Sequence, residues 1–323
     1  MKIAVYGPGG AGGYFGARLA RSGQDVVFIA RGDHLEAIRN AGLRVDSVKG
    51  DFVLHPAKAT DNPASVGPVD MILLGVKAWQ VPELASTLSP LVGPDTAVLP
   101  LQNGVETAGQ LSGVLGPNHV MGGLAKIISY KVAPGYIRHI GAEPYIALGE
   151  LDGQYRKRTE RIRLAIEGAG ITVEVPADIQ AAVWEKFLFV VSWGGVGAVT
   201  RSPIGVIRSV PETRRMLEQS MEEIFALAVK RSIAMAGGTV KKAMVFVDTL
   251  PPNGTASLQR DIDEGKPSEL DAWNGAVVRL GQDASVPVPL NSFIYHSLLP
   301  QEMRAREKLT QQERCRRKND QRS

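Results

Sequence analysis

The sequence contains a single cysteine, Cys315, among its 323 residues. One cysteine excludes an internal disulfide framework and a metal site built from several cysteines, and it fits a reducing compartment. Long apolar runs are also missing: the best candidate, residues 187–199, is shorter than the roughly 18–20 residues of a membrane helix, and we expect it to be broken by Gly194, Gly195 and Gly197. Because we also expect no signal peptide, the sequence predicts a cytoplasmic protein that does not bind a membrane.

Charge of one sign gathers in only one place. The formal net charge is +4, and residues 301–323 hold eight basic and four acidic side chains, so the rest of the chain balances to zero. This tail has no aromatic residues and is rich in Gln and Arg, which favours a frayed end over a nucleic-acid-binding segment. We therefore expect that deleting the residues after Gln301 leaves the chemistry intact.

The first 31 residues carry the clearest pattern. Residues 2–6 form a short apolar run of β-formers, residues 14–21 have a helical pattern that ends at Gly23, and residues 24–30 form another strand. The turn after the first strand consists of Gly7, Pro8, Gly9, Gly10, Ala11 and Gly12. Strand, Gly-x-Gly-x-x-Gly, helix and strand make the βαβ unit that binds a dinucleotide.

The three motif glycines have separate mechanical reasons. Gly7 permits the tight turn off the strand, Gly9 lets the backbone approach a pyrophosphate, and Gly12 lets the helix pack closely on the sheet. The N-terminus of the helix then offers N–H groups and the positive end of a dipole to the phosphates.

Arg31 follows the second strand. An NAD enzyme usually has Asp or Glu there to bind the ribose 2′-hydroxyl, whereas an Arg suits a 2′-phosphate, so we expect NADP as the cofactor. A solvated Arg at a strand end is the alternative. Asp33 to Glu36 has the pattern of a capping box that opens the next helix, which would place Arg31 in a short loop before it.

Two further runs, residues 69–76 and 96–101, are nearly continuous in apolar residues, as expected of parallel strands buried on both faces. The first delivers Lys77 at its carboxyl end, and the second delivers Asn103. Ligands bind outside the carboxyl ends of such strands, so Gly7, Arg31, Lys77 and Asn103 are expected at one edge of the sheet.

Short β-like runs at 120–130, 135–140 and 144–148 suggest antiparallel strands that extend the same sheet. Residues 43–48 and 52–55 form a predicted hairpin, and a helix over 156–169 precedes a last strand over 171–175. From Ala177 onward the patterns are helical, over 180–192, 212–235, 241–250 and 269–280. The long helix from Glu212 could pack within its own domain or against a second subunit, so a homodimer is left open.

The sequence therefore predicts an α/β fold in which a Rossmann-type dinucleotide-binding domain is followed by an all-helical domain. We place the NADP-binding domain at 1–176, a helical substrate and catalytic domain at 177–300, and the basic tail at 301–323.

Five stretches, in order, resemble the ketopantoate reductase (2-dehydropantoate 2-reductase) family. They are the turn at 7–12, Val76 to Gln80, Gln102 to Gly104, Trp184 to Phe187, and Ser257 to Ile262 with Glu269 twelve residues after Ser257. The likeness extends from Met1 to about Gln301. It implies NADPH-dependent reduction of a small-molecule 2-keto acid to a 2-hydroxy acid, by default ketopantoate to pantoate in pantothenate biosynthesis.

The resemblance also assigns roles to residues. It implies that Lys186 is the general acid, that Glu269 orients substrate or cofactor, that Ser257 binds the substrate, that Asn103 touches cofactor and substrate, that Lys77 lies beside them, and that Ile128 contacts the cofactor through its backbone. Elementary chemistry agrees for Lys186, because an ammonium can both stabilise and protonate the alkoxide formed from a ketone.

Both catalytic candidates, Lys186 and Glu269, also have a purely structural interpretation. Lys186 lies in a predicted helix of mainly apolar residues, where partial burial would lower its pKa toward the working pH. The alternative is a Lys that snorkels from the edge of an apolar helix. Glu269 follows Ser268, a predicted N-cap, and could merely compensate the helix dipole.

One departure from the family pattern bears on the substrate. The family has Asn where this sequence has Val190, Gly194 and Ile204. Residues 186, 190 and 194 share one face of a helix, so the face expected to bind ketopantoate is apolar or bare. This leaves open a paralogue that reduces a different, bulkier or more apolar 2-keto acid.

Other side chains could replace the missing amides. The candidates are Ser192, Trp193, Arg201 and Ser202, with Arg201 suited to bind a carboxylate through two hydrogen bonds. A non-catalytic NADP-binding sensor of redox state is a third reading, but the retained Lys186, Ser257 and Glu269 argue against it.

Overall fold

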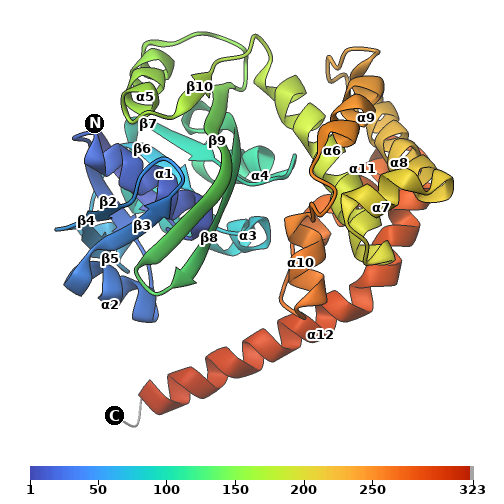
Figure 1. Cartoon of the computed structure of the whole chain (residues 1–323). Helices are drawn as coiled ribbons and strands as arrows, with labels where there is room; N and C mark the ends of the chain where they lie inside the picture. Colours follow the sequence, from blue (N-terminus) through green and yellow to red (C-terminus); the bar gives the residue numbers. More distant parts are fainter. Residues whose placement is uncertain (321–323) are drawn as a thin grey trace. The chain divides into compact units, whose positions relative to one another are not determined.

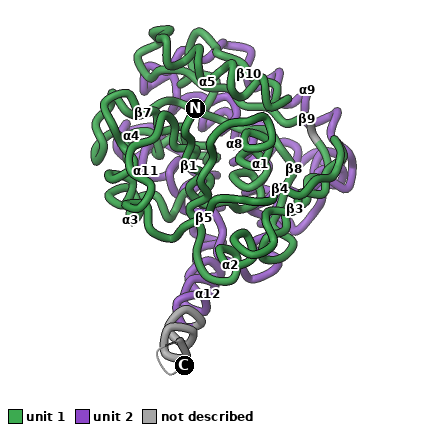
Figure 2. Tube along the Cα trace, turned by 90° about the vertical axis from the view of Figure 1, so that its left-hand side faces the viewer, with its two compact units in different colours: residues 1–183 green, residues 184–323 purple. Residues whose placement is uncertain are grey.

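The structure, a computed structural model, describes residues 1–320; the side chains of residue 142 and of residues 312–320 lie outside this description. The chain divides into two compact units, the first ending at Val183 and the second beginning at Trp184 (Figure 2). All the described strands belong to the first unit, and the described residues of the second are helical or in loops. The predicted boundary near Pro176 falls shortly before this division.

The first unit contains ten strands and several helices (Figure 1). The strands are β1 (Lys2–Tyr6), β2 (Asp25–Ile29), β3 (Leu43–Ser47), β4 (Phe52–Leu54), β5 (Lys58–Thr60), β6 (Val69–Leu74), β7 (Val92–Pro100), β8 (Met121–Ala133), β9 (Tyr136–Glu150) and β10 (Thr172–Glu174). The helices are α1 (Gly10–Arg21), α2 (Gly32–Ala41), α3 (Val81–Leu84), α4 (Thr107–Leu115) and α5 (Lys157–Gly168), with short 3-10 helices η1 (Pro63–Ser65), η2 (Ala78–Gln80), η3 (Ala85–Leu91) and η4 (Pro117–His119).

One sheet is a Rossmann-type parallel sheet. Its strand order is β5-β2-β1-β6-β7, and each neighbouring pair runs parallel. Tyr6, the last residue of β1, pairs with Ile29 of β2 and with Leu74 of β6. The strand order reverses direction after β1, so its carboxyl end is the topological switch point at which such sheets bind ligands.

The remaining strands form a second five-stranded sheet, not an extension of the first. The predicted hairpin is present as antiparallel β3 and β4, β3 pairs with β9, and β8 and β9 form a long antiparallel hairpin. The expectation that β8 and β9 extend the parallel sheet is therefore wrong. The runs at 135–140 and 144–148, predicted as two strands, are one strand, β9.

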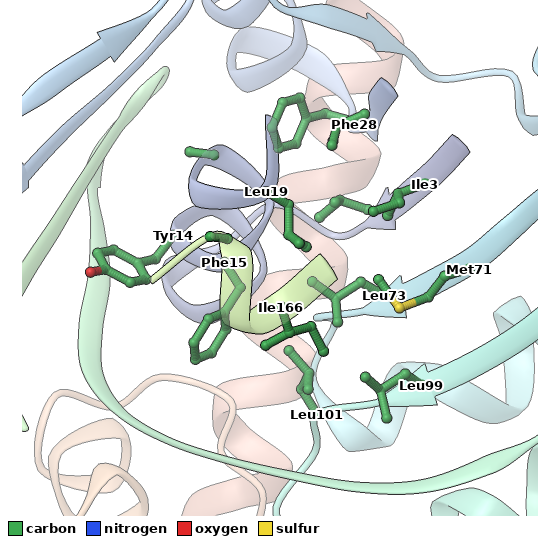
Figure 3. Packing of buried hydrophobic residues seen from close by; sticks show 14 of the residues in the cluster. Ile3, Tyr14, Phe15, Leu19, Phe28, Met71, Leu73, Leu99, Leu101 and Ile166 are labelled. Atoms are coloured by element: carbon green, nitrogen blue, oxygen red, sulfur yellow. The ribbon is translucent and has the colours of Figure 1, made fainter. Parts of the chain in front are cut away.

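The parallel sheet is buried on both faces because its side chains alternate between two cores. Alternate residues such as Val5, Leu73 and Leu99 pack with α1, and the intervening residues Ala4, Ile72 and Val98 pack with α3, η3 and α4. Figure 3 shows the first core, where Tyr14, Phe15 and Leu19 of α1 and Ile166 of α5 meet the sheet residues. This explains why the sequence shows continuous apolar runs there.

The second unit is built from helices that begin with α6. They are α6 (Ile179–Thr200), α7 (Ile204–Ser209), α8 (Pro211–Lys230), α9 (Thr239–Thr249), α10 (Ser257–Asp263), the π-helix η5 (Asp271–Gly275), α11 (Ala276–Ala284) and α12 (Pro289–Asp320). The apolar face of α8, including Leu217, Met221 and Ile224, is fully buried. Of the two interpretations of this helix, the structure shows packing within its own domain.

Helix α6 runs without interruption through three glycines that were expected to break its apolar run, so that expectation is wrong. By length and composition alone α6 could cross a membrane, and 56% of its most apolar window is buried within the structure. A buried core helix passes the same test, so the feature is weak evidence for a membrane span.

Residues 301–311 continue α12, whereas the sequence predicted a frayed tail from residue 301 onward. Glu302 and Ala305 are both buried. The prediction of a frayed end is therefore wrong for this segment. Cys315 and five of the eight basic residues of the tail fall outside the described side chains.

Candidate active site

The residues that follow four parallel strands meet at one edge of the first sheet, as predicted. Gly7 follows β1 and its N–H donates to Ile29 O of β2 at 3.1 Å. Gly75 after β6 donates to Tyr6 O at 2.8 Å, and Leu101 after β7 donates to Leu74 O at 3.1 Å. The loops that carry Gly7, Arg31, Lys77 and Asn103 therefore leave the sheet side by side.

The glycine turn has no room for side chains where the backbone packs. Gly7 has a φ of +82°, and a Cβ at Gly12 would lie 2.4 Å from Gly7 O. A Cβ at Gly10 would lie 2.4 Å from Ser129 O of β8. At Gly9, in contrast, a Cβ would meet nothing within 4 Å, so the turn faces open space there.

This open side fits the pyrophosphate of a dinucleotide. Gly9 is the N-cap residue of α1 and, having no side chain, makes no cap hydrogen bond to the N–H groups at the start of that helix. Uncapped N–H groups at a helix N-terminus bind phosphate groups well, because the helix dipole also favours negative charge there.

Arg31 lies at the end of β2 as predicted, but its local structure differs from the prediction. Helix α2 begins at Gly32, so Arg31 itself is the N-cap residue and Asp33 lies in the first turn. The predicted capping box from Asp33 to Glu36 is therefore wrong. The Arg31 side chain is exposed, which leaves it accessible to a ligand at this edge.

His34 fixes the glycine turn from α2, a role that the sequence did not reveal. Its Nε2 lies 2.8 Å from Pro8 O, and Gly135 N–H donates to its Nδ1 at 2.9 Å. The Gly135 bond makes Nδ1 an acceptor, so the proton is on Nε2 and Nε2–H donates to Pro8 O. Burial lowers the pKa of this imidazole, and the positive charge of Lys131 lowers the pKa further.

The loops after β6 and β7 are tied together by Gln102. Its Nε2 donates to Leu74 O and to Val76 O, both at 2.9 Å, and the side chain is buried. This fixes the position of the neighbouring Asn103, which is half-buried. Lys77, also half-buried, is the N-cap residue of η2, and its N–H donates to Gln80 Oε1 at 3.1 Å.

Ile128 lies on β8, next to the residue that approaches the glycine turn. Its side chain is 48% exposed, and it pairs with Gly141 at an irregularity of the β8–β9 ladder. The backbone of the adjacent Ser129 runs against Gly10. The structure thus places the β8 backbone at the turn where the resemblance implied a contact.

In the second unit, Lys186 is half-buried on α6 between the exposed Glu185 and the buried Phe187. Further along α6, a Cβ at Gly194 would lie 2.7 Å from Trp273 Cζ3 and 3.2 Å from Leu258 Cβ. Helix α6 therefore packs against α10 and η5 at Gly194, eight residues after Lys186; its partners there are Leu258, which follows Ser257, and Trp273, four residues after Glu269.

Ser257 is half-buried at the first residue of α10, and Glu269 is 7% exposed in the segment just before η5. Glu269 O accepts the Trp273 N–H at 3.0 Å. The predicted N-cap at Ser268 is wrong, because η5 begins at Asp271 with Leu270 as its N-cap residue, although Ser268 Oγ does accept a hydrogen bond from Leu270 N at 3.2 Å. Glu269 is thus more deeply buried than a carboxylate that only compensates a helix dipole needs to be.

No group of three or more His, Cys, Asp or Glu side chains suited to a metal occurs among the described residues.

Residues 3–153 match the family model described as "Ketopantoate reductase PanE/ApbA", and residues 178–302 match the model of its C-terminal domain. The chain belongs to the ketopantoate reductase family. Its relatives include the 2-dehydropantoate 2-reductase of Nostoc sp., 30% identical over 302 residues that cover 92% of this chain and 94% of the relative. That of Mesorhizobium japonicum is 31% identical and covers 90% of this chain and 94% of the relative.

Solved structures agree. The 2-dehydropantoate 2-reductase of Geobacter metallireducens has a TM-score of 0.86 and 32% identity, covering 93% of this chain and 99% of that structure. A D-mandelate dehydrogenase in complex with NADH and anilino(oxo)acetate, at 20% identity, has the same fold with a TM-score of 0.86. By its family, this ketopantoate reductase family member is an oxidoreductase.

The family's three amide positions have different surroundings in this member. Val190 is half-buried on α6, the Trp273 ring occupies the space where a side chain at Gly194 would lie, and Ile204 is fully buried. The face beyond Val190 is therefore not bare, as the sequence suggested, but closed by an aromatic ring.

Most of the side chains that could replace the missing amides are either hydrogen-bonded within the protein or far from Lys186. Ser192 is buried and accepts a hydrogen bond from Ser220 at 2.8 Å, and Ser202 Oγ donates to Thr200 O at 3.0 Å. Arg201 follows the end of α6, about 22 Å along the axis from Lys186 at 1.5 Å per residue. Trp193 differs, because its Nε1 is buried and has no hydrogen-bond partner among the described residues.

Proposed function

We propose that the protein reduces a 2-keto acid to a 2-hydroxy acid with NADPH in the cytoplasm, with ketopantoate to pantoate as the default reaction. The observation that carries this proposal is the glycine turn, open at Gly9 and followed by an uncapped helix, in a family member that retains Lys186. The open turn supports a dinucleotide, and the retained lysine supports turnover over the alternative of a redox sensor.

The chain's own residues would divide the work as follows. The turn and the N-terminus of α1 would hold the pyrophosphate, and Arg31 would bind the 2′-phosphate. Asn103, Lys77 and the Ile128 backbone would contact the cofactor. The reduced nicotinamide, when bound, supplies hydride to the carbonyl carbon.

Lys186 would donate the proton to the carbonyl oxygen of the substrate as negative charge develops there. Its half-buried position supports this role, because reduced contact with water strengthens the interaction of an ammonium with an oxyanion. Ser257 would bind the substrate, and Glu269 would orient substrate or cofactor.

A second candidate is reduction of a more apolar 2-keto acid. Phe189, Val190 and Trp193 lie near Lys186 along α6, and the Phe189 and Trp193 rings are 5.5 Å apart between centroids. Such a surface suits an apolar or aromatic substituent better than the hydroxyl of ketopantoate.

A panel of 2-keto acids, followed through NADPH oxidation, tests both candidates. Ketopantoate as the best substrate supports the default, and a higher kcat/KM for branched or aromatic 2-keto acids supports the second. The control is Lys186→Ala, which should lower kcat by about 10²–10⁴-fold while NADPH binding stays unchanged. Cofactor binding without turnover of any keto acid would show a sensor instead.

The cofactor preference has its own test. Arg31→Ala should weaken NADPH binding by about 10–100-fold, as expected for the loss of a charged hydrogen bond, and leave NADH binding nearly unchanged. Equal effects on both cofactors would show that Arg31 is only a solvated strand-end residue.

A further inference from the structure

The segment that carries Glu269 is held by the C-terminal helix. Glu302 of α12 accepts the Ser268 N–H with Oε1 at 3.2 Å and Oε2 at 3.0 Å, and Ser268 Oγ also donates to Oε2. Arg306, one turn further along α12, donates from Nε to Glu302 Oε1 at 2.7 Å and reaches Ser268 O at 3.3 Å. Both backbone groups of Ser268 are thus bound from α12.

Glu302 lies on the buried face of α12, where its buried neighbours on the helix are apolar. The positions that α12 buries around it are Ile294, Leu298 and Ala305, and the Glu302 side chain is only 2% exposed. A carboxylate at such a position is costly unless it is paired and hydrogen-bonded, and this one is both. The hydrogen bonds and the ion pair of Glu302 therefore form a specific contact between α12 and the segment that carries Glu269.

The backbone on the other side of Glu269 is fixed as well. Leu270 N–H donates to Ser268 Oγ, and Glu269 O accepts from Trp273 N. Asp271, the residue after Leu270, accepts a hydrogen bond on Oδ1 from the Tyr295 hydroxyl of α12 at 3.0 Å. Helix α12 thus holds this segment before and after Glu269, at Ser268 and at Asp271.

We propose that Glu302 is a positioning residue, which acts through Ser268 to hold Glu269 in the orientation that the reduction needs. The inference rests on the proposed function, because it assumes that Glu269 orients substrate or cofactor. It reverses the expectation that the chain after Gln301 is dispensable: residues 302–306 support the site, and only the residues beyond 311 can be removed without effect.

The test compares Glu302→Gln with Glu269→Gln in the full-length protein. The Gln variant at 302 keeps the shape but loses the charge that binds Ser268 and Arg306. We expect NADPH binding within twofold of wild type, and a fall of at least tenfold in kcat/KM for the best 2-keto acid. The double variant should be no worse than Glu269→Gln alone, because both changes act on the same group.

Glu307→Gln, an exposed acid on the same helix, is the matched control and should change nothing. Chains that end after Gln301 and after residue 311 give a second comparison: the shorter one should lose activity, and the longer one should keep it. Wild-type kinetics in Glu302→Gln, or additive losses in the double variant, would overturn the inference. So would a lower Tm in Glu302→Gln with kcat/KM of the folded protein unchanged.

The two failures can be told apart. A wild-type chain that reduces no 2-keto acid overturns the proposed function and this inference together. An active wild type with an equally active Glu302→Gln variant overturns this inference alone.

Discussion

Glycines gather in two regions of this molecule, and they serve different purposes. In the turn after β1, the missing side chain of Gly9 leaves open space in front of a helix N-terminus. In the middle of α6, the missing side chains of Gly194 and Gly197 are replaced by Trp273 and by Gln259, whose Oε1 would lie 2.6 Å from a Cβ at residue 197. The first region leaves open space, where we propose that the cofactor binds, and the second makes room for other parts of the protein.

The contrast shows what kind of information each pattern carries. The turn is defined by backbone geometry between a strand and a helix that adjoin it in sequence, so its spacing alone indicates its use. The glycines of α6 are defined by partners about 60 to 80 residues away, which the local sequence does not reveal. There, helix-breaking tendency is overridden by packing.

The largest effects are expected at the turn. Gly12→Ala should destabilise the fold by about 1–3 kcal/mol, because its Cβ would lie 2.4 Å from Gly7 O and the backbone must shift. Gly9→Ala should leave the free energy of unfolding nearly unchanged, since its Cβ meets open space, yet weaken NADPH binding at least tenfold. Urea unfolding and cofactor fluorescence measure the two quantities separately.

If Gly9→Ala binds NADPH as well as wild type does, the open space is not where the pyrophosphate lies. The first half of the comparison would then fail, and the turn would be only a packing feature like the one in α6.

The second half of the comparison is tested by restoring family amides on α6. Gly194→Asn should destabilise the protein by about 1–3 kcal/mol, because the Trp273 ring occupies the space. Val190→Asn, at a half-buried position on the same face, should fold with a smaller loss and raise kcat/KM for ketopantoate relative to apolar keto acids. Thermal unfolding and the substrate panel provide the measurements.

A stable Gly194→Asn protein with improved ketopantoate reduction would show that the position still faces the substrate. In that case the Trp273 ring moves aside readily, and the glycines of α6 resemble those of the turn more than the structure suggests.

The sequence predicted the parallel strands, the glycine turn and the placement of Arg31 because each depends on neighbours in sequence or on alternation along a strand. It did not predict the second sheet, because the partners of β8 and β9 are set by long-range pairing with β3. It misplaced the start of α2, whose N-cap residue is Arg31 and not Asp33.

The burial of Glu302 was missed for a related reason. A net positive charge over residues 301–323 suggested a solvated tail, and charge counts ignore position on a helix. The signal was present in the spacing, since Glu302 continues the buried series Ile294 and Leu298 at intervals of four residues. An acidic residue on an apolar stripe indicates a buried partner, and it outweighs the average charge of the segment.

The smallest effect concerns His34, and it limits the contrast between the two regions, because even the turn depends on a distant side chain. Neutral His34 joins Pro8 O to Gly135 N–H, and its pKa is below the ordinary value of 6.5. A lowered pKa means that the unfolded chain binds the proton more tightly. The bonds therefore contribute stability that is complete above pH 6.5 and is lost as the pH falls through the folded-state pKa.

His34→Gln, which does not titrate, should cost about 0.5–1.5 kcal/mol at pH 8, and the difference from wild type should shrink toward pH 5. His296→Gln, at an exposed position, is the control for the loss of a histidine. NADPH affinity should follow the same trend, because Pro8 lies in the turn and protonated His34 can no longer accept the Gly135 N–H. A difference between His34→Gln and wild type that stays constant from pH 8 to pH 5 would show that the imidazole only fills space. The turn would then be as locally determined as its sequence implies.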